Sequence, residues 1–133
     1  MTHLSRIKLS SKTEKELKSA LKETFLKLNP RNYERLSSAL ITKTEELMIA
    51  KRLGAIIMLS EGYTYADVSQ SLKLTNETIS RINFEMKASP ENHKFLLKKL
   101  KPWMRKKLLK EVLTEIGLQA AKVAIKHAGG RIR

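Results

Sequence analysis

Hydrophobic residues recur every three or four positions along most of this chain, which is the spacing of one face of an α-helix. The pattern predicts a first helix over residues 12–28, capped by Ser11 or Thr13, and a second over residues 31–40. Alternating apolar and polar runs, as in a half-buried strand, do not occur in the sequence. With only five glycines and three prolines in 133 residues, the sequence predicts an all-α fold.

Residues 43–60 predict a longer helix that is apolar on nearly every side. Thr42 and Glu45 have the spacing of a capping box at its start, and Lys51 and Arg52 are almost its only polar residues after the first turn. A helix that is apolar all round is buried all round. We therefore expect a homodimer in which a second copy packs alongside this helix. The alternative is a central helix wrapped by its own chain.

Residues 62–82 predict two short helices joined by a tight turn. Thr64 is expected to cap the first, with Asp67 three residues later, and Thr75 to cap the second. Such a turn favours glycine because its backbone has a positive φ, and here it holds Lys73. The expected buried residues are Val68, Leu72, Ile79 and Ile82, and the polar side of the second helix carries Asn76, Glu77, Thr78, Ser80 and Arg81. The arrangement predicts a helix-turn-helix.

The formal net charge is +14 and is unevenly distributed. Residues 1–87 hold 15 Lys and Arg against 10 Asp and Glu, whereas residues 88–133 hold 12 against 3. This excess favours binding to nucleic acid first, to an anionic membrane second and to an acidic protein third. We expect a dimerisation and helix-turn-helix domain over residues 1–89 and a basic helical extension over residues 90–133.

The residue types that carry catalysis or bind metals are sparse. Cysteine is absent, and His3, His93 and His127 lie far apart, so we expect neither disulfides nor a metal site. The sequence has no glycine-rich phosphate loop, paired carboxylates or Ser/His/Asp set, so we do not expect an enzyme. It also has no apolar run near the roughly 20 residues of a membrane span and no secretory signal. These features predict a cytoplasmic protein without a membrane partner.

The segment Leu40–Arg81 (LITKTEELMIAKRLGAIIMLSEGYTYADVSQSLKLTNETISR) resembles the Trp repressor superfamily, and its uncharacterised Trp-repressor-like branch more than the tryptophan-sensing repressor. The resemblance covers roughly Arg35–Lys87. It implies an intertwined all-α homodimer with about six helices in the helix-turn-helix domain. It does not cover the basic tail, where the spacing of apolar residues predicts one or two further helices. It also implies regulation of transcription through operator binding, with the helix-turn-helix at 64–87 and the recognition helix 76–87 in the major groove.

In the tryptophan-sensing member two arginines enclose the corepressor. The resemblance places Arg52 and Arg81 at their positions and Thr42 at a further ligand contact, which makes these three residues a candidate effector pocket. However, Ile82 stands where that member has glycine, and Glu85 where it has serine. These departures argue against tryptophan. No cofactor is predicted, and another small-molecule corepressor remains open.

DNA affinity comes mainly from phosphate contacts and specificity from base edges. We expect Thr64, Tyr65 and Lys73 to contact phosphates. Asn76, Thr78 and Ser80 are candidates for base edges, because asparagine pairs with adenine and hydroxyls accept several partners. Glu77 repels phosphate and is a candidate discriminator, and Arg81 is a candidate for guanine, phosphate or effector. The full set of candidate DNA-binding residues is Thr64, Tyr65, Lys73, Thr75, Asn76, Glu77, Thr78, Ser80 and Arg81.

Each role has a purely structural alternative. Thr75 and Asn76 could serve only as helix caps, and Tyr63 and Tyr65 only as packing residues. For Arg52 the alternative is an ion pair with a glutamate; the candidates are Glu45, Glu46 and Glu85.

The densest basic cluster consists of Lys98, Lys99, Lys101, Arg105, Lys106, Lys107 and Lys110. We hypothesise that it contacts nucleic acid without sequence preference. In the rival account the lysines only stay solvated while the apolar stripe from Met104 to Ile116 packs on the dimer. That stripe also suits a helix at a membrane surface. For the whole chain, the alternative to a sequence-specific regulator is a non-specific RNA- or nucleoid-binding basic protein.

Overall fold

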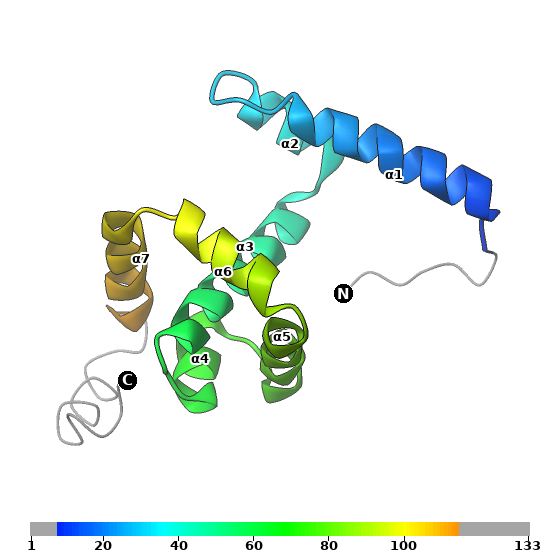
Figure 1. Ribbon diagram of the computed structural model, residues 1–133. Helices are drawn as coiled ribbons and strands as arrows, with labels where there is room; N and C mark the ends of the chain where they lie inside the picture. Colours follow the sequence, from blue (N-terminus) through cyan, green and yellow to red (C-terminus); the bar gives the residue numbers. More distant parts are fainter. Residues whose placement is uncertain (1–7, 115–133) are drawn as a thin grey trace, which may run out of the picture. The chain divides into compact units, whose positions relative to one another are not determined.

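The computed structural model describes residues 8–114, and over that range it is entirely helical and loop (Figure 1). The described helices are α1 (Ser11–Leu26), α2 (Tyr33–Leu40), α3 (Lys43–Ser60), α4 (Tyr65–Leu72), α5 (Asn76–Ala88), α6 (Pro90–Lys99) and α7 (Pro102–Thr114). The predicted all-α class is confirmed. Predictions that concern residues 1–7 and 115–133, including the stripe's end at Ile116 and the later part of the C-terminal extension, lie outside the described residues.

The chain forms two compact units, residues 1–43 and 44–133. The predicted boundary between 89 and 90 is a different division, based on composition, and it stays a prediction. Within the first unit, Ser10 caps α1 by accepting a hydrogen bond from the Thr13 N–H at 3.2 Å. The expectation that Ser11 or Thr13 caps this helix is therefore wrong, because the chain becomes helical one residue earlier than the apolar stripe indicates.

Asparagine hydrogen bonds delay the start of α2 to Tyr33. Asn29 Oδ1 accepts from the Arg31 and Asn32 N–H groups at 2.9 and 3.0 Å, and Asn32 Oδ1 accepts from the Asn29 N–H at 2.9 Å. Within residues 8–43, no residue of α1 or α2 is buried. The apolar stripe of α1, which includes Leu17, Leu21 and Phe25, is thus not covered within its own unit.

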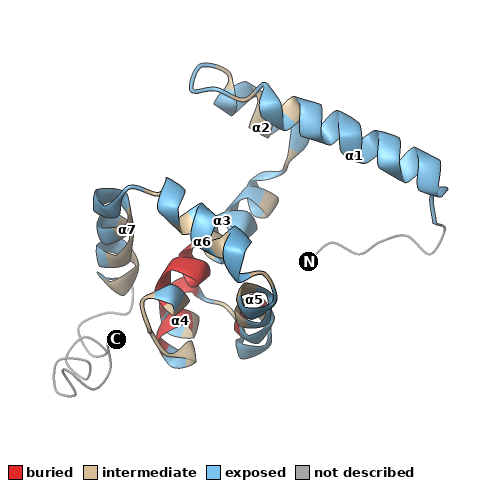
Figure 2. Cartoon of the chain, viewed as in Figure 1, coloured by how far each residue is buried: buried red, intermediate tan, exposed pale blue. Residues whose placement is uncertain are grey.

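The core of the second unit lies where the C-terminal half of α3 meets α4 and α5, shown in red in Figure 2. Its members are Ala55, Ile56, Met58, Val68, Leu72, Ile79 and Ile82. Gly54 allows α4 to approach α3 closely, since a Cβ there would lie 3.3 Å from Leu72 Cδ1. The four core residues predicted for the motif helices are confirmed.

Only the C-terminal half of α3 is covered within its own unit. Gly54–Met58 are buried, whereas Leu47, Met48 and Ile49 are exposed, Ile49 by 58%. Residues 47–49 are thus not covered by the helices of their own unit, and both accounts of this helix, packing against a second copy and wrapping by its own chain, stay predictions. The apolar residues of α4 and α5 pack against residues 55–58 and leave the first half of α3 with an uncovered apolar surface.

Gly62 ends α3 with a left-handed residue at φ 91°. The Tyr63 N–H donates to the Met58 carbonyl and the Gly62 N–H to the Leu59 carbonyl, both at 3.1 Å, which is the Schellman pattern. The expected role of Gly62 is confirmed, and the turn leads directly into α4.

The last two helices pack onto the helix-turn-helix. α6 packs against α5 and α7 against α4, and Leu97, Leu109, Val112 and Leu113 pack against the core. Both helices begin with a proline, which suits the first turn because its N–H would have no helical partner. None of the described helices is long and apolar enough to span a bilayer.

Candidate nucleic-acid interface

A reciprocal capping box fixes the start of α4. Thr64 Oγ1 accepts from the Asp67 N–H at 3.1 Å, and Asp67 Oδ2 accepts from the Thr64 N–H at 3.2 Å. The cap predicted from sequence is confirmed. It orders the backbone at the N-terminus of α4, where free N–H groups would favour an anion such as a phosphate.

The turn between α4 and α5 holds Lys73 in the left-handed conformation, with φ 57° and ψ 49°. A non-glycine residue has a cost of about 1 kcal/mol or more in this region. Two side-chain hydrogen bonds hold the turn: Lys73 Nζ donates to the Gln70 carbonyl at 2.9 Å, and Ser69 Oγ donates to the Leu74 carbonyl at 2.8 Å. Lys73 remains exposed, with two of its three ammonium protons unused by this bond.

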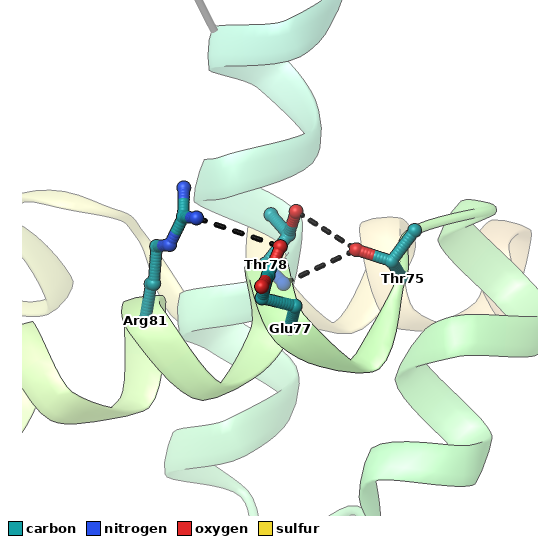
Figure 3. Close-up of polar contacts among 4 residues, drawn as sticks. All are labelled: Thr75, Glu77, Thr78 and Arg81. Atoms are coloured by element: carbon teal, nitrogen blue, oxygen red, sulfur yellow. Dashed lines mark hydrogen bonds and ion pairs between the residues drawn. The ribbon is translucent and has the colours of Figure 1, made fainter.

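Thr75 caps α5 (Figure 3). Its Oγ1 accepts from the Thr78 N–H at 3.2 Å and donates to Thr78 Oγ1 at 3.0 Å. The hydroxyl proton of Thr75 is therefore used within the helix, and the capping alternative is confirmed for Thr75. It is wrong for Asn76, which occupies the first helical position after the cap and is exposed.

The two faces of α5 differ as the sequence predicts. Ile79 and Ile82 are buried in the core, whereas Asn76, Glu77, Ser80 and Arg81 are exposed, with Thr78 half-buried between them. Arg81 Nη2 and Glu77 Oε1 lie 3.4 Å apart, one helical turn along the exposed face (Figure 3). Both side chains remain largely solvent-exposed, at 60% and 78%, so water screens this pair and it adds little stability.

Phe84 is a functional candidate that the sequence analysis missed. It follows Arg81 by three residues and Ser80 by four, which puts it on the same face of α5, and it is 69% exposed. An aromatic side chain that stands among polar ones on an exposed helix face offers an apolar contact. The sequence could have indicated this exposure, because residue 84 does not lie on the helix face that carries the buried side chains of Ile79 and Ile82 and the partly buried one of Met86.

Tyr65 is half-buried and packs against the core, and its hydroxyl accepts a hydrogen bond from Asn83 Nδ2 at 3.1 Å. Tyr63 also packs against the core. Both tyrosines therefore pack against the core, and a phosphate contact by Tyr65 stays a prediction. The hydroxyl proton of Tyr65 is still available to a phosphate, since the phenol oxygen acts only as acceptor in this bond.

The three candidate effector residues all belong to the described part of the chain. Arg52 is exposed on α3, Arg81 is paired with Glu77, and Thr42 belongs to the other compact unit. Ile82 packs in the core at 2% exposure, so its side chain fills the position where tryptophan-sensing members have glycine. This placement agrees with the argument against tryptophan.

The residues of the basic cluster differ in their exposure. Lys98, Lys99, Lys101, Lys106, Lys107 and Lys110 are exposed. The ammonium of Lys99 lies 5.0 Å from the centre of the Phe95 ring. Arg105 differs, because it is half-buried and its Nε atom is buried without a hydrogen-bond partner among the described residues. Arg105 therefore lies on the docked side of α7 and not with the exposed lysines.

Comparison with known proteins gives one finding. A family model described as Trp repressor protein matches residues 15–101, from within α1 to the residue before α7. No curated protein and no solved structure matches the chain.

Proposed function

This chain belongs to the Trp repressor family, and we propose that it is a sequence-specific, DNA-binding regulator of transcription that acts as a homodimer. The family is one of helix-turn-helix DNA-binding regulators and not of enzymes. The observation that carries the proposal is the exposed polar face of α5, held outward by Ile79 and Ile82 in the core. In the proposal this face enters the major groove, which is wide enough to admit an α-helix.

Three polar side chains of α5 would contact base edges. Asn76 is exposed at the first helical position, and an asparagine amide can bond adenine at two atoms. Ser80 is exposed one turn later. Thr78 is half-buried, but its hydroxyl proton remains available because the group accepts from Thr75. Thr75 itself acts as the cap that positions these residues and contributes no base contact.

The Glu77–Arg81 pair supports a discriminating role. In the free protein Glu77 holds the Arg81 guanidinium near the exposed face at 3.4 Å. On a cognate site Arg81 would turn to guanine or a phosphate, while Glu77 would accept from a cytosine amino group. On other sequences Glu77 would face phosphate without a partner, which disfavours binding.

Phe84 adds an apolar element to the same face. Its exposed ring is suited to the C5-methyl group of thymine, which only A·T pairs present in the major groove. Thr64, Tyr65 and Lys73 would set the register by contacting phosphates at the N-terminus of α4 and at the turn. Such contacts position the protein without carrying sequence information.

Uncovered apolar surface supports the homodimer. Leu47, Met48 and Ile49 on α3 are exposed in the single chain, and so are Leu17, Leu21 and Phe25 on α1. Clustered exposed apolar residues are typical of a surface that packs against a partner. A second copy is the occupant that the family resemblance implies, and it would supply a second α5. A cytoplasmic location, where the DNA is, belongs to the same proposal.

Selection of binding sites from random duplex DNA tests the proposal. We expect a pseudo-palindrome whose half-sites are centred about one helical turn apart, roughly 34–36 Å. If no sequence is enriched, and the protein binds the final pool, the starting pool and single-stranded RNA equally tightly, the result would instead favour the non-specific RNA- or nucleoid-binding alternative. Repeating the selection with metabolite extract tests for a corepressor, since none is assigned.

A further inference from the structure

We propose that α7 is a second DNA-contacting helix, which binds the phosphates of the duplex flanking the bases contacted by α5. This inference rests on the proposed function and adds a partner surface to it. The family match ends at Lys101, so the family relationship does not account for α7.

The position of α7 relative to α5 is fixed through α4. Leu109, Val112 and Leu113 of α7 pack against the core, and α4 packs against both α7 and α5. Figure 1 shows α5 and α7 flanking α4. The exposed face of α7 is therefore held at a fixed place relative to α5, on the other side of α4.

The exposed face of α7 is basic. Trp103, Lys106, Lys107 and Lys110 are spaced at i, i+3, i+4 and i+7, which puts them on one side of the helix, and all four are exposed. The half-buried residues Arg105, Leu108, Leu109, Val112 and Leu113 lie on the other side. Within residues 8–114 none of the three lysines forms an ion pair, so their charges are available to an anionic partner.

The segment that precedes α7 is also positively charged. Residues 90–101 hold four Lys against one Glu. Lys98, Lys99 and Lys101 are exposed at the end of α6 and in the linker that follows it. A row of positive charge along an ordered surface matches a regular row of phosphates, and it gives affinity without sequence preference.

Duplex DNA fits this face better than a membrane. A helix at a membrane surface buries its apolar side in the lipid. In α7 that side is already occupied, because Leu109, Val112 and Leu113 pack on the core of the unit. Trp103, at 59% exposure, and Met104 are the large apolar residues of α7 that stay exposed. As the only tryptophan of the chain, Trp103 is also a specific probe of contact at this face.

The test is the salt dependence of binding by the full chain to a selected duplex that extends one helical turn beyond each half-site. A variant with Lys106→Gln, Lys107→Gln and Lys110→Gln is compared with the natural chain. The matched control, Lys12→Gln, Lys15→Gln and Lys22→Gln, removes the same charge from exposed positions of α1. Circular dichroism checks that both variants keep their helices.

We expect the slope of log affinity against log salt to become shallower in the α7 variant by roughly 0.9 for each lysine that contacts a phosphate, and to change little in the control. We also expect Trp103 fluorescence to change with the extended duplex and not with one trimmed to the half-sites. An unchanged slope, or equal losses in both variants, would overturn the inference. The inference would also be overturned if the α7 variant, but not the control, lost binding to phosphatidylglycerol vesicles while its slope of log DNA affinity against log salt stayed the same.

Failure of this inference is distinguishable from failure of the proposed function. If no sequence is selected from random duplexes, the proposed function fails. If a site is selected, and the slope of log affinity against log salt for that site is the same with and without the α7 lysines, only the role of α7 fails.

Discussion

The side-chain amide of Asn83 donates a hydrogen bond of 3.1 Å to the phenol oxygen of Tyr65, which ties the middle of α5 to the first residue of α4. The two residues are 18 positions apart in the chain. The bond joins the two helices at the end opposite the turn, where Lys73 and Thr75 already hold them. It thus adds a second point that fixes the angle at which α5 is presented.

We expect Tyr65→Phe to lower the free energy of unfolding by about 1 kcal/mol, because it removes this part-buried hydrogen bond. Asn83→Ala should cost a similar amount, and the double variant should cost less than the sum, since both changes remove one interaction. Urea denaturation of the full chain measures all three. Ser80→Ala, at an exposed position of α5, is the control and should leave stability unchanged; strictly additive losses would show that the bond does not form.

Glu77→Gln should tighten binding to every duplex and reduce the preference for the selected site. The substitution removes a carboxylate that repels phosphate and releases Arg81 from its ion pair. Stability should hardly change, because the pair is exposed. Dissociation constants for the selected and a scrambled duplex at one salt concentration provide the measurement.

Glu14→Gln is the matched control for Glu77, because Glu14 also pairs with a cation one turn away, Lys18 at 2.9 Å. It changes the net charge of the chain by the same amount but lies on α1. If Glu14→Gln weakens discrimination as much as Glu77→Gln, the effect comes from net charge and not from the recognition face.

Phe84→Ala should abolish the difference between thymine and deoxyuridine at one position of each half-site. Loss of one buried methyl group is worth about 0.8 kcal/mol, so the natural chain should bind the deoxyuridine duplex about fourfold more weakly at the contacted position. The variant should bind both duplexes equally. Because Phe84 is exposed in the free chain, its removal should not destabilise the fold. If the natural chain binds the thymine and deoxyuridine duplexes with equal affinity at every position, Phe84 does not contact a thymine methyl group.

Ile49→Glu should convert the proposed homodimer into a monomer. Ile49 is exposed in the single chain, so a charge there costs little within one copy but would be buried without a partner in an interface. Sedimentation velocity of the full chain reports the oligomeric state. Thr44→Glu, an exposed position nearer the start of the same helix, serves as the control and should remain dimeric. An unchanged dimer with Ile49→Glu would place the interface elsewhere.

Much of the recognition unit was predictable from local sequence. The caps at Thr64 and Thr75, the stop at Gly62 and the left-handed Lys73 all depend on residues within a few positions of one another. The buried pair Ile79 and Ile82 followed from helical spacing alone. Phe84 was missed because the predicted exposed face of α5 included only polar residues, whereas Phe84 is apolar and yet 69% exposed.

The sequence by itself determined the helix ends within the helix-turn-helix and which side of each helix is apolar, since both depend on contacts within a turn or two of the backbone. The predicted starts of α1 and α2 were one residue too late and two residues too early. Only the tertiary structure decided what covers those apolar sides. It left the first half of α3 uncovered, turned Arg105 toward the docked side of α7, and joined Asn83 to Tyr65. The reason is that hydrophobic attraction has no direction, so an apolar stripe shows that a helix needs a partner without specifying which helix that partner is.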